Sequence, residues 1–145
     1  MLLEQSSLAG EEKTKKRLAN MVKLAQAEYL AGELKGAYEH FAECGKLAQQ
    51  ARQFETLCSV LTSAGEIERI REHHDKAMAF FEKSLEISEK LELEQYVADN
   101  LVNIGIVKEE QGEYGEAMDF FQQALARAVT DEQRQNISYY IFQRS

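Results

Sequence analysis

The stretch that decides the fold reads NIGIVKEEQGEYGEAMDFFQQAL and covers residues 103–125. Its apolar residues recur at intervals of three and four, which is the period of a helix face and not of a strand. Gly112 interrupts this pattern at a place where the C-terminus of a helix favours a left-handed residue. The stretch therefore predicts two helices joined by a short turn, with their apolar faces packed together.

The same pattern occurs three times at a spacing of forty residues. The matching sets are Ala25, Gly65 and Gly105; Ala37, Ala77 and Ala117; Phe41, Phe81 and Phe121; and Cys44, Ser84 and Ala124. Small residues let the two helices of a unit cross closely, and the phenylalanine fills the space beside the crossing. Because one helix pair cannot bury its apolar face alone, such units stack side by side. The sequence predicts an all-α fold, an α-solenoid of three antiparallel helix pairs plus a C-terminal capping helix.

The expected boundaries follow from this register. First helices are expected near residues 12–31, 53–71 and 93–111, and second helices near 34–51, 74–91 and 114–129. Gly32 and Gly112 are expected at the turns of the first and third pairs, with His73 and His74 taking that place in the middle pair. Residues 1–11 are interpreted as an N-terminal extension and 12–145 as a single domain, with repeats near 18–57, 58–97 and 98–137.

These residues resemble the tetratricopeptide repeat, which has small residues at the helix crossing, a glycine at the turn, and an alanine followed four residues later by phenylalanine. The resemblance covers about residues 18–137 and is clearest in the third unit. The usual repeat has about 34 residues and often closes with proline, whereas here the period is forty and there is no proline. The resemblance implies the long-repeat subclass found in adaptors that bind extended peptides in a concave groove.

In a solenoid of helix pairs the first helices line the concave face, so their outward positions are the candidate partner-binding residues. These positions are Lys23, Gln26, Tyr29, Thr62, Ser63, Glu66, Arg69, Asp99, Val102, Asn103 and Ile106. Such a mixed polar and apolar strip suits a peptide whose backbone lacks partners of its own. The carboxylate clamp of some family members is not supported, because no convergent set of lysine, arginine and asparagine is evident. Acidic residues on the strip indicate a ligand that carries lysine or arginine.

A capping box over residues 130–133 predicts one more helix, over 131–144. Four large side chains follow one another on it, namely Tyr139, Tyr140, Ile141 and Phe142. One helix cannot turn all four inward, so two interpretations remain open. The helix is either a terminal cap with an aromatic rim or a contact through which the chain forms a homo-oligomer or stacks on further repeats.

The composition narrows the class of partner. The net charge is −8, which opposes binding to a phosphate backbone, so nucleic acid is not expected. No long apolar run indicates a membrane span or a signal peptide, so no membrane is expected. Two cysteines, Cys44 and Cys58, fit reduced thiols in the cytoplasm.

The search for catalytic groups identifies no set with the required spacing. The run His73-His74-Asp75 is interpreted as a surface loop, because adjacent histidines do not easily face one ion. Neither cysteine stands in a fixed relation to a histidine. We therefore expect no enzyme activity, no metal and no cofactor.

The leading hypothesis is a non-catalytic interaction module, an adaptor or scaffold that binds a protein or peptide partner in the concave groove. Two alternatives stay open. The first is a structural self-assembly element that stacks through its C-terminal helix. The second is a repeat fragment of a larger ligand-sensing regulator.

Overall fold

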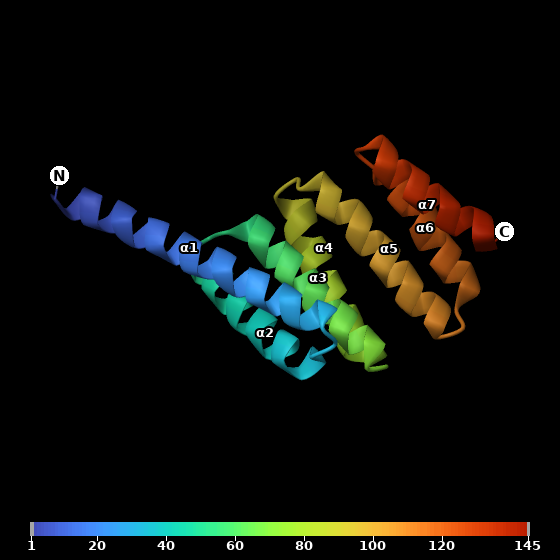
Figure 1. The fold of residues 1–145 in the computed structure, drawn as a ribbon. Coiled ribbons are helices and arrows are strands. Elements are labelled where there is room, and N and C mark those ends of the chain that lie inside the picture. Colours follow the sequence, from blue (N-terminus) through green and yellow to red (C-terminus); the bar gives the residue numbers. More distant parts are fainter. Residues whose placement is uncertain (1, 145) are drawn as a thin grey trace. The chain divides into compact units, whose positions relative to one another are not determined.

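The computed structural model describes residues 2–144, with side chains from residue 8 onward, and every regular element in that range is a helix (Figure 1). The helices are α1 (Leu2–Leu30), α2 (Leu34–Gln50), α3 (Phe54–Ile70), α4 (His74–Lys90), α5 (Glu94–Glu110), α6 (Tyr114–Arg127) and α7 (Asp131–Arg144). The predicted all-α fold class is confirmed. The chain forms two compact units, residues 1–60 and 61–145, with the division inside α3.

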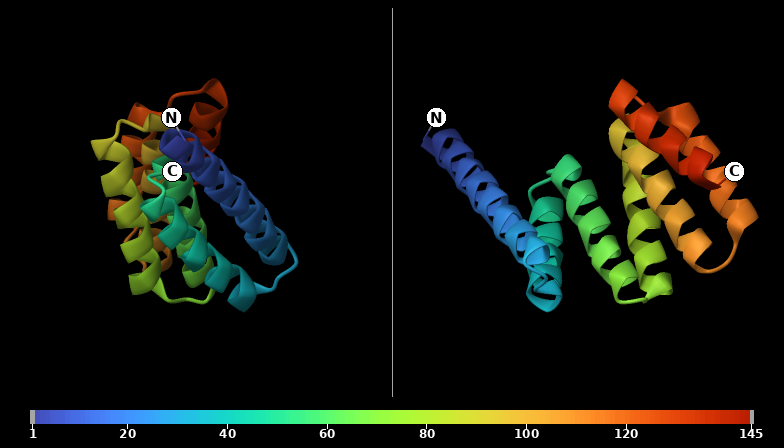
Figure 2. Two further views of the ribbon diagram at one scale, coloured as in Figure 1. Left: turned by 90° about the vertical axis from the view of Figure 1, so that its left-hand side faces the viewer. Right: turned by 45° about the vertical axis from the view of Figure 1, so that its right-hand side comes forward.

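The first unit contains the antiparallel pair α1 and α2 together with the start of α3 (Figure 1). Ala25, Ala37, Phe41 and Cys44 are buried in it, as the register predicts. The first helix begins at Leu2 and not near residue 12, so its N-terminal part runs on past α2 (Figure 2). This part contains no proline and many strong helix formers, so nothing interrupts the helix before the predicted start.

Five turns of one geometry separate α1 to α6, and they recur every twenty residues. The second residue after each helix has a positive φ, at Gly32, Arg52, Glu72, Glu92 and Gly112. In each turn two backbone N–H groups donate hydrogen bonds to carbonyls near the end of the preceding helix. In the middle pair, for example, the His73 N–H donates to the Glu68 carbonyl and the Glu72 N–H to the Arg69 carbonyl. This is the Schellman closure of a helix.

The middle turn corrects one expectation. The left-handed position belongs to Glu72, with a φ of 65°, and not to His73 or His74. His73 is the next residue and His74 begins α4. The reason is that the Schellman closure fixes which residue turns left-handed by counting from the helix end, so a non-glycine residue takes that conformation where the chain offers no glycine.

We predict that Glu72→Gly raises the free energy of unfolding by about 0.5 to 1 kcal/mol, because glycine has no Cβ to clash in the left-handed conformation. The same replacement at Glu82, which is exposed in the middle of α4, is the matched control. There glycine lowers stability by about 0.5 to 1 kcal/mol. Urea titrations of both variants check the prediction, and a loss of stability in Glu72→Gly would contradict it.

In the second unit, the rings of Phe81 and Phe121 are fully buried. A Cβ built on Gly65 would lie 2.6 Å from Cε1 of Phe81, and one on Gly105 would lie 2.7 Å from Cε1 of Phe121. Packed carbon atoms do not approach so closely, so each ring requires the glycine. The sequence analysis placed the phenylalanine beside the close helix crossing, and the structure shows that the ring itself is the group that requires the glycine.

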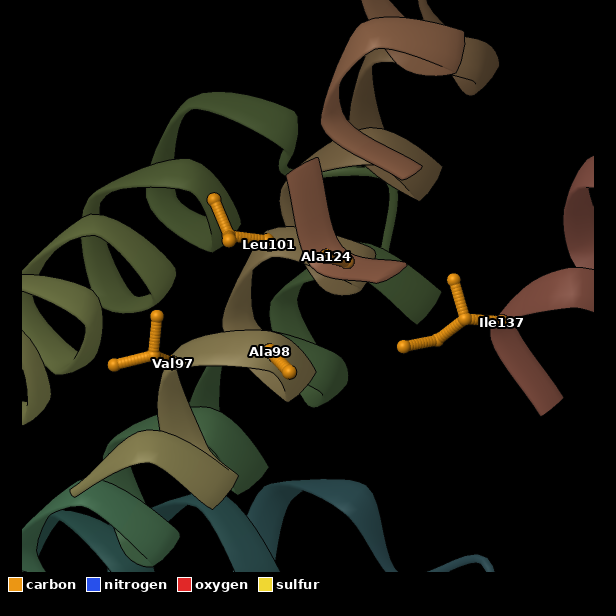
Figure 3. Close-up of a cluster of buried hydrophobic side chains, with 5 residues drawn as sticks. All are labelled: Val97, Ala98, Leu101, Ala124 and Ile137. Atoms are coloured by element: carbon orange, nitrogen blue, oxygen red, sulfur yellow. The ribbon is translucent and has the colours of Figure 1, made fainter. Parts of the chain in front are cut away.

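The C-terminal helix packs as predicted for a capping helix. Figure 3 shows Ile137 of α7 pointing toward Ala98 of α5 and Ala124 of α6, and these three residues share a buried cluster with Val97 and Leu101. The second unit, from the later part of α3 to α7, is held together by small, aliphatic and aromatic side chains.

Candidate partner-binding face

Within the second unit, the outward residues of two neighbouring first helices form the candidate face. Ser63 and Glu66 of α3 and Val102, Asn103 and Ile106 of α5 are all half-buried. We call these five residues the α3–α5 face. It combines an amide, a hydroxyl and a carboxylate with two aliphatic side chains, so it offers hydrogen bonds and apolar contact together.

Thr62 was predicted on this face, but its hydroxyl is engaged inside the protein. It donates a hydrogen bond to Oδ1 of Asn100 at 3.0 Å and lies 3.3 Å from Oγ of Ser84. The Asn100 amide in turn donates to Oγ of Ser84 and to the Tyr96 carbonyl, both at 2.8 Å. Asn100 is fully buried, and the sequence analysis did not single it out. This polar network joins α3, α4 and α5 and positions the helices that carry the α3–α5 face.

Two other predicted face residues are held by neighbouring helices. Arg69 of α3 donates to Glu110 of α5 at 3.2 Å. Asp99 of α5 is exposed and accepts a hydrogen bond from the amide of Gln133 of α7 at 2.9 Å. These contacts fix α3 and α7 against α5.

Glu66 supplies the one carboxylate among the five residues of the α3–α5 face. Its pKa is raised, chiefly by burial; the Arg69 charge opposes the shift and the Asp99 charge adds to it. Stability linked to its protonation is therefore present at acid pH and is lost as the pH rises through the raised pKa. At neutral pH the ionised carboxylate gains nothing from folding, so a Glu66→Gln variant is expected to fold at least as well as the wild type.

The remaining predicted residues lie on α1, in the first unit. Lys23 and Gln26 are exposed and Tyr29 is half-buried. Nearby, Nδ1 of His40 on α2 lies 2.5 Å from a carboxylate oxygen of Glu28. His40 is half-buried in its helix, as its register position indicates.

The four large residues of α7 divide between two sides of the helix. Tyr140 stacks on Phe121, with ring centroids 5.7 Å apart, and Ile141 packs against the cluster that contains Ile137. Tyr139 and Phe142 point outward, with 60% and 78% of their surface exposed. Homo-oligomer formation through them stays a prediction.

Arg144 fastens the last turn of α7. Its guanidinium donates to both carboxylate oxygens of Glu109 and lies over the rings of Phe121 and Tyr140 at 5.3 and 4.9 Å from their centroids. A cation that is both paired and stacked in this way holds a helix end more firmly than a simple surface ion pair does.

Two corresponding positions near the ends of α3 and α5 carry opposite charges, Glu68 in one repeat and Lys108 in the next. Glu68, only 2% exposed, lies 2.7 Å from Nδ1 of His73 and 3.5 Å from the Arg71 guanidinium. Forty residues later the corresponding position is Lys108, whose ammonium lies 3.1 Å from Glu113 and 3.3 Å from Glu116. The hydrogen bonds that Lys108 donates to these two carboxylates raise its pKa.

Within the described part of the chain, no group of His, Cys, Asp and Glu side chains has the arrangement of a metal site. None of the helices described is both long and apolar enough to cross a bilayer. Both cysteines are buried, and burial raises the pKa of the Cys44 thiol to about 11.

We predict that Cys44 reacts slowly with iodoacetamide in the folded protein. Raising its pKa from 9.0 to about 11 lowers the thiolate fraction at mildly alkaline pH by roughly a hundredfold, and burial slows access further. Mass spectrometry of the labelled peptides, with the urea-unfolded chain as reference, measures the ratio. Equal labelling rates in the folded and unfolded states would contradict the prediction.

Comparison with known proteins identifies the family. A comparison with curated protein sequences finds no match. Among solved structures, the TPR domain of Arabidopsis FLU is similar, with a TM-score of 0.73 and 19% identity over 79% of this chain and 96% of that one. The Yersinia enterocolitica type III secretion translocator chaperone SycD has a TM-score of 0.75 and 14% identity, over 89% of this chain and 90% of that one.

A third similar structure is the N-terminal domain of stress-induced protein-1 from C. elegans, with a TM-score of 0.68 and 13% identity over 87% of this chain and 95% of that one. At such identities these similarities show the fold, which is that of a helix-pair solenoid. The tetratricopeptide repeat profile matches residues 55–128, half of the chain. The match covers the second and third helix pairs, where the forty-residue register is clearest, and the chain therefore belongs to the tetratricopeptide repeat family.

Proposed function

We propose that this chain is a non-catalytic interaction module whose α3–α5 face binds an extended segment of a partner protein. The observation that carries the proposal is the composition of that face, where half-buried Asn103 and Ser63 lie beside Val102 and Ile106. An extended peptide needs backbone hydrogen-bond partners and a place for its apolar side chains, and this strip offers both. Membership of a family of interaction modules supports the same function.

Rigidity of the two helices also favours binding. The Arg69–Glu110 hydrogen bond and the network around Asn100 tie α3 to α5. A surface that is already ordered loses little conformational freedom when a ligand binds, so more of the contact energy appears as affinity. One of the similar structures, SycD, is a chaperone of type III secretion translocators, and this supports a protein partner here.

The test is a selection of binding peptides from a random phage-displayed library on the immobilised chain, followed by fluorescence anisotropy with the enriched peptides. Asn103→Ala and Ile106→Ala are each expected to weaken binding by about tenfold, because each removes contact at the centre of the proposed site.

Gln123→Ala is the control, since this amide side chain is exposed on α6 and its removal leaves the α3–α5 face intact. Circular dichroism verifies that each variant is folded. The proposal is wrong if no peptide is enriched, or if enriched peptides bind both face variants as tightly as the wild type.

A further inference from the structure

We propose that the binding surface continues from the α3–α5 face onto α7, where Tyr139 and Phe142 receive an apolar or aromatic side chain. We further propose that the partner segment carries a lysine or arginine that faces Glu66 and Asp99. This inference rests on the proposed function and names the chemistry of the segment bound there.

The forty-residue register places the two aromatic residues on the same face as the site. Tyr139 corresponds to Asp99 and Phe142 to Val102. The inward positions of α7 follow the same register, since Ile137 corresponds to Val97 and both lie in one buried cluster. Because the inward sides of α5 and α7 correspond, their outward sides correspond as well.

The contacts of α7 hold this outward side in place. Ile137, Tyr140 and Arg144 fix the opposite side of the helix to α5 and α6. Tyr139 and Phe142 are left 60% and 78% exposed. Exposed aromatic side chains on a rigid element are typical anchors of protein interfaces, since they bury a large area for few rotatable bonds.

The charges around the α3–α5 face favour a partner segment that is positively charged. The nearby arginines are engaged, Arg69 with Glu110 and Arg144 with Glu109. Among the residues that the structure describes, Asp99 accepts a hydrogen bond only from the neutral amide of Gln133, and Glu66 accepts none. The Arg69 charge that acts on Glu66 is shared with Glu110. Residues 51–145 carry eighteen acidic against ten basic side chains, so a cationic segment is attracted to this part of the chain and an acidic one is repelled.

The distance between the helices determines how far apart the basic and the apolar residue of the partner segment lie in its sequence. Packed helices lie about 8 to 10 Å apart, and an extended chain advances about 3.3 Å per residue. One helix spacing corresponds to about three residues and two spacings to about five or six. The basic residue is therefore expected about three positions from the apolar residue if it faces Asp99 on α5, and about five or six if it faces Glu66 on α3.

The experiment uses the peptides enriched from the random library and compares their binding to two test variants and two control variants. Glu66→Gln, which keeps the side-chain size, is expected to weaken their binding by about tenfold at low salt and less at high salt. Phe142→Ala is expected to weaken it by about tenfold. Matched controls are Glu116→Gln and Tyr114→Ala, which alter an exposed carboxylate and an exposed ring on α6 and are expected to change nothing.

The outcomes separate this inference from the proposed function. Enriched peptides that share a basic and an apolar residue at the stated spacing, and that lose affinity for Glu66→Gln and Phe142→Ala but not for the controls, support it. Peptides that depend on Asn103 and Ile106 yet lack a basic residue, or bind Glu66→Gln normally, overturn the inference and leave the proposed function standing.

Failure to enrich any peptide overturns both. Sedimentation velocity gives the last outcome. If the wild type self-associates and Phe142→Ala abolishes that association without weakening peptide binding, the aromatic pair binds a second copy of the chain and the α7 part of the inference is wrong.

Discussion

Replacing Phe81 by alanine is expected to lower the free energy of unfolding by about 3 to 5 kcal/mol. The ring is fully buried and lies against Gly65, a residue without a side chain that could move into the space. The neighbouring helices therefore cannot refill the cavity easily, and both the lost burial and the cavity contribute to the loss. Urea unfolding followed by circular dichroism measures it.

The matched control is Phe142→Ala, the same replacement at a ring that is 78% exposed. Its effect on stability is expected to stay within about 0.5 kcal/mol. Equal losses at the two positions would mean that the Phe81 ring does not fill the space between α3 and α4. The same control also shows that Phe142→Ala is folded, which the binding experiment requires.

Asn100→Ala is expected to lower the free energy of unfolding by about 2 to 4 kcal/mol. The replacement removes three hydrogen bonds and leaves the Thr62 and Ser84 hydroxyls without the amide that satisfies them. A buried polar group that loses its partner keeps its full desolvation penalty, so the loss exceeds the value of one ordinary hydrogen bond. The control Asn103→Ala, at the half-buried face, is expected to change stability by less than about 1 kcal/mol.

A double-mutant cycle tests whether the network acts as a unit. Once Ser84 is alanine, Asn100→Ala is expected to cost about 1 kcal/mol less than in the wild type, because one partner is already absent. Strict additivity of the two losses would contradict a coupled network. The two asparagines are thus expected to have different roles. Replacing Asn100 lowers stability, and replacing Asn103 weakens binding.

The repeat predicted most of the fold because its signal is redundant. Phe41, Phe81 and Phe121 occupy the same position in the three repeats, and all three are buried. Each repeat thus gives independent evidence for which side of the helices is buried in the others. An error in one helix boundary does not change the alignment of the repeats. The profile match over residues 55–128 falls where this redundancy is greatest.

The polar network was missed because it occurs only once. The positions that correspond to Asn100 are Val60 and Tyr140, so the register gives no sign of a buried amide there. Thr62 was assigned to the outward strip from its helical phase alone, whereas its hydroxyl is satisfied by a residue thirty-eight positions away. A pairing between unlike positions of different repeats depends on how the helices stack, which periodicity does not contain.

The left-handed turn at Glu72 was missed for a related reason. A glycine such as Gly32 or Gly112 indicates a left-handed conformation by its residue type, whereas a glutamate does not. The position was nevertheless determined by counting forty residues from either glycine. Register was the better guide than composition at this turn.

The change of sign between Glu68 and Lys108 has a consequence for assembly. If the hairpins exchanged partners, so that α3 packed on α6, Glu68 would meet Glu113 and Glu116 at the place where Lys108 now holds them. Three carboxylates gathered around one site repel one another strongly. Neighbouring repeats that share a fold therefore do not fit one another's partners at this edge, which discourages slippage by one repeat during folding.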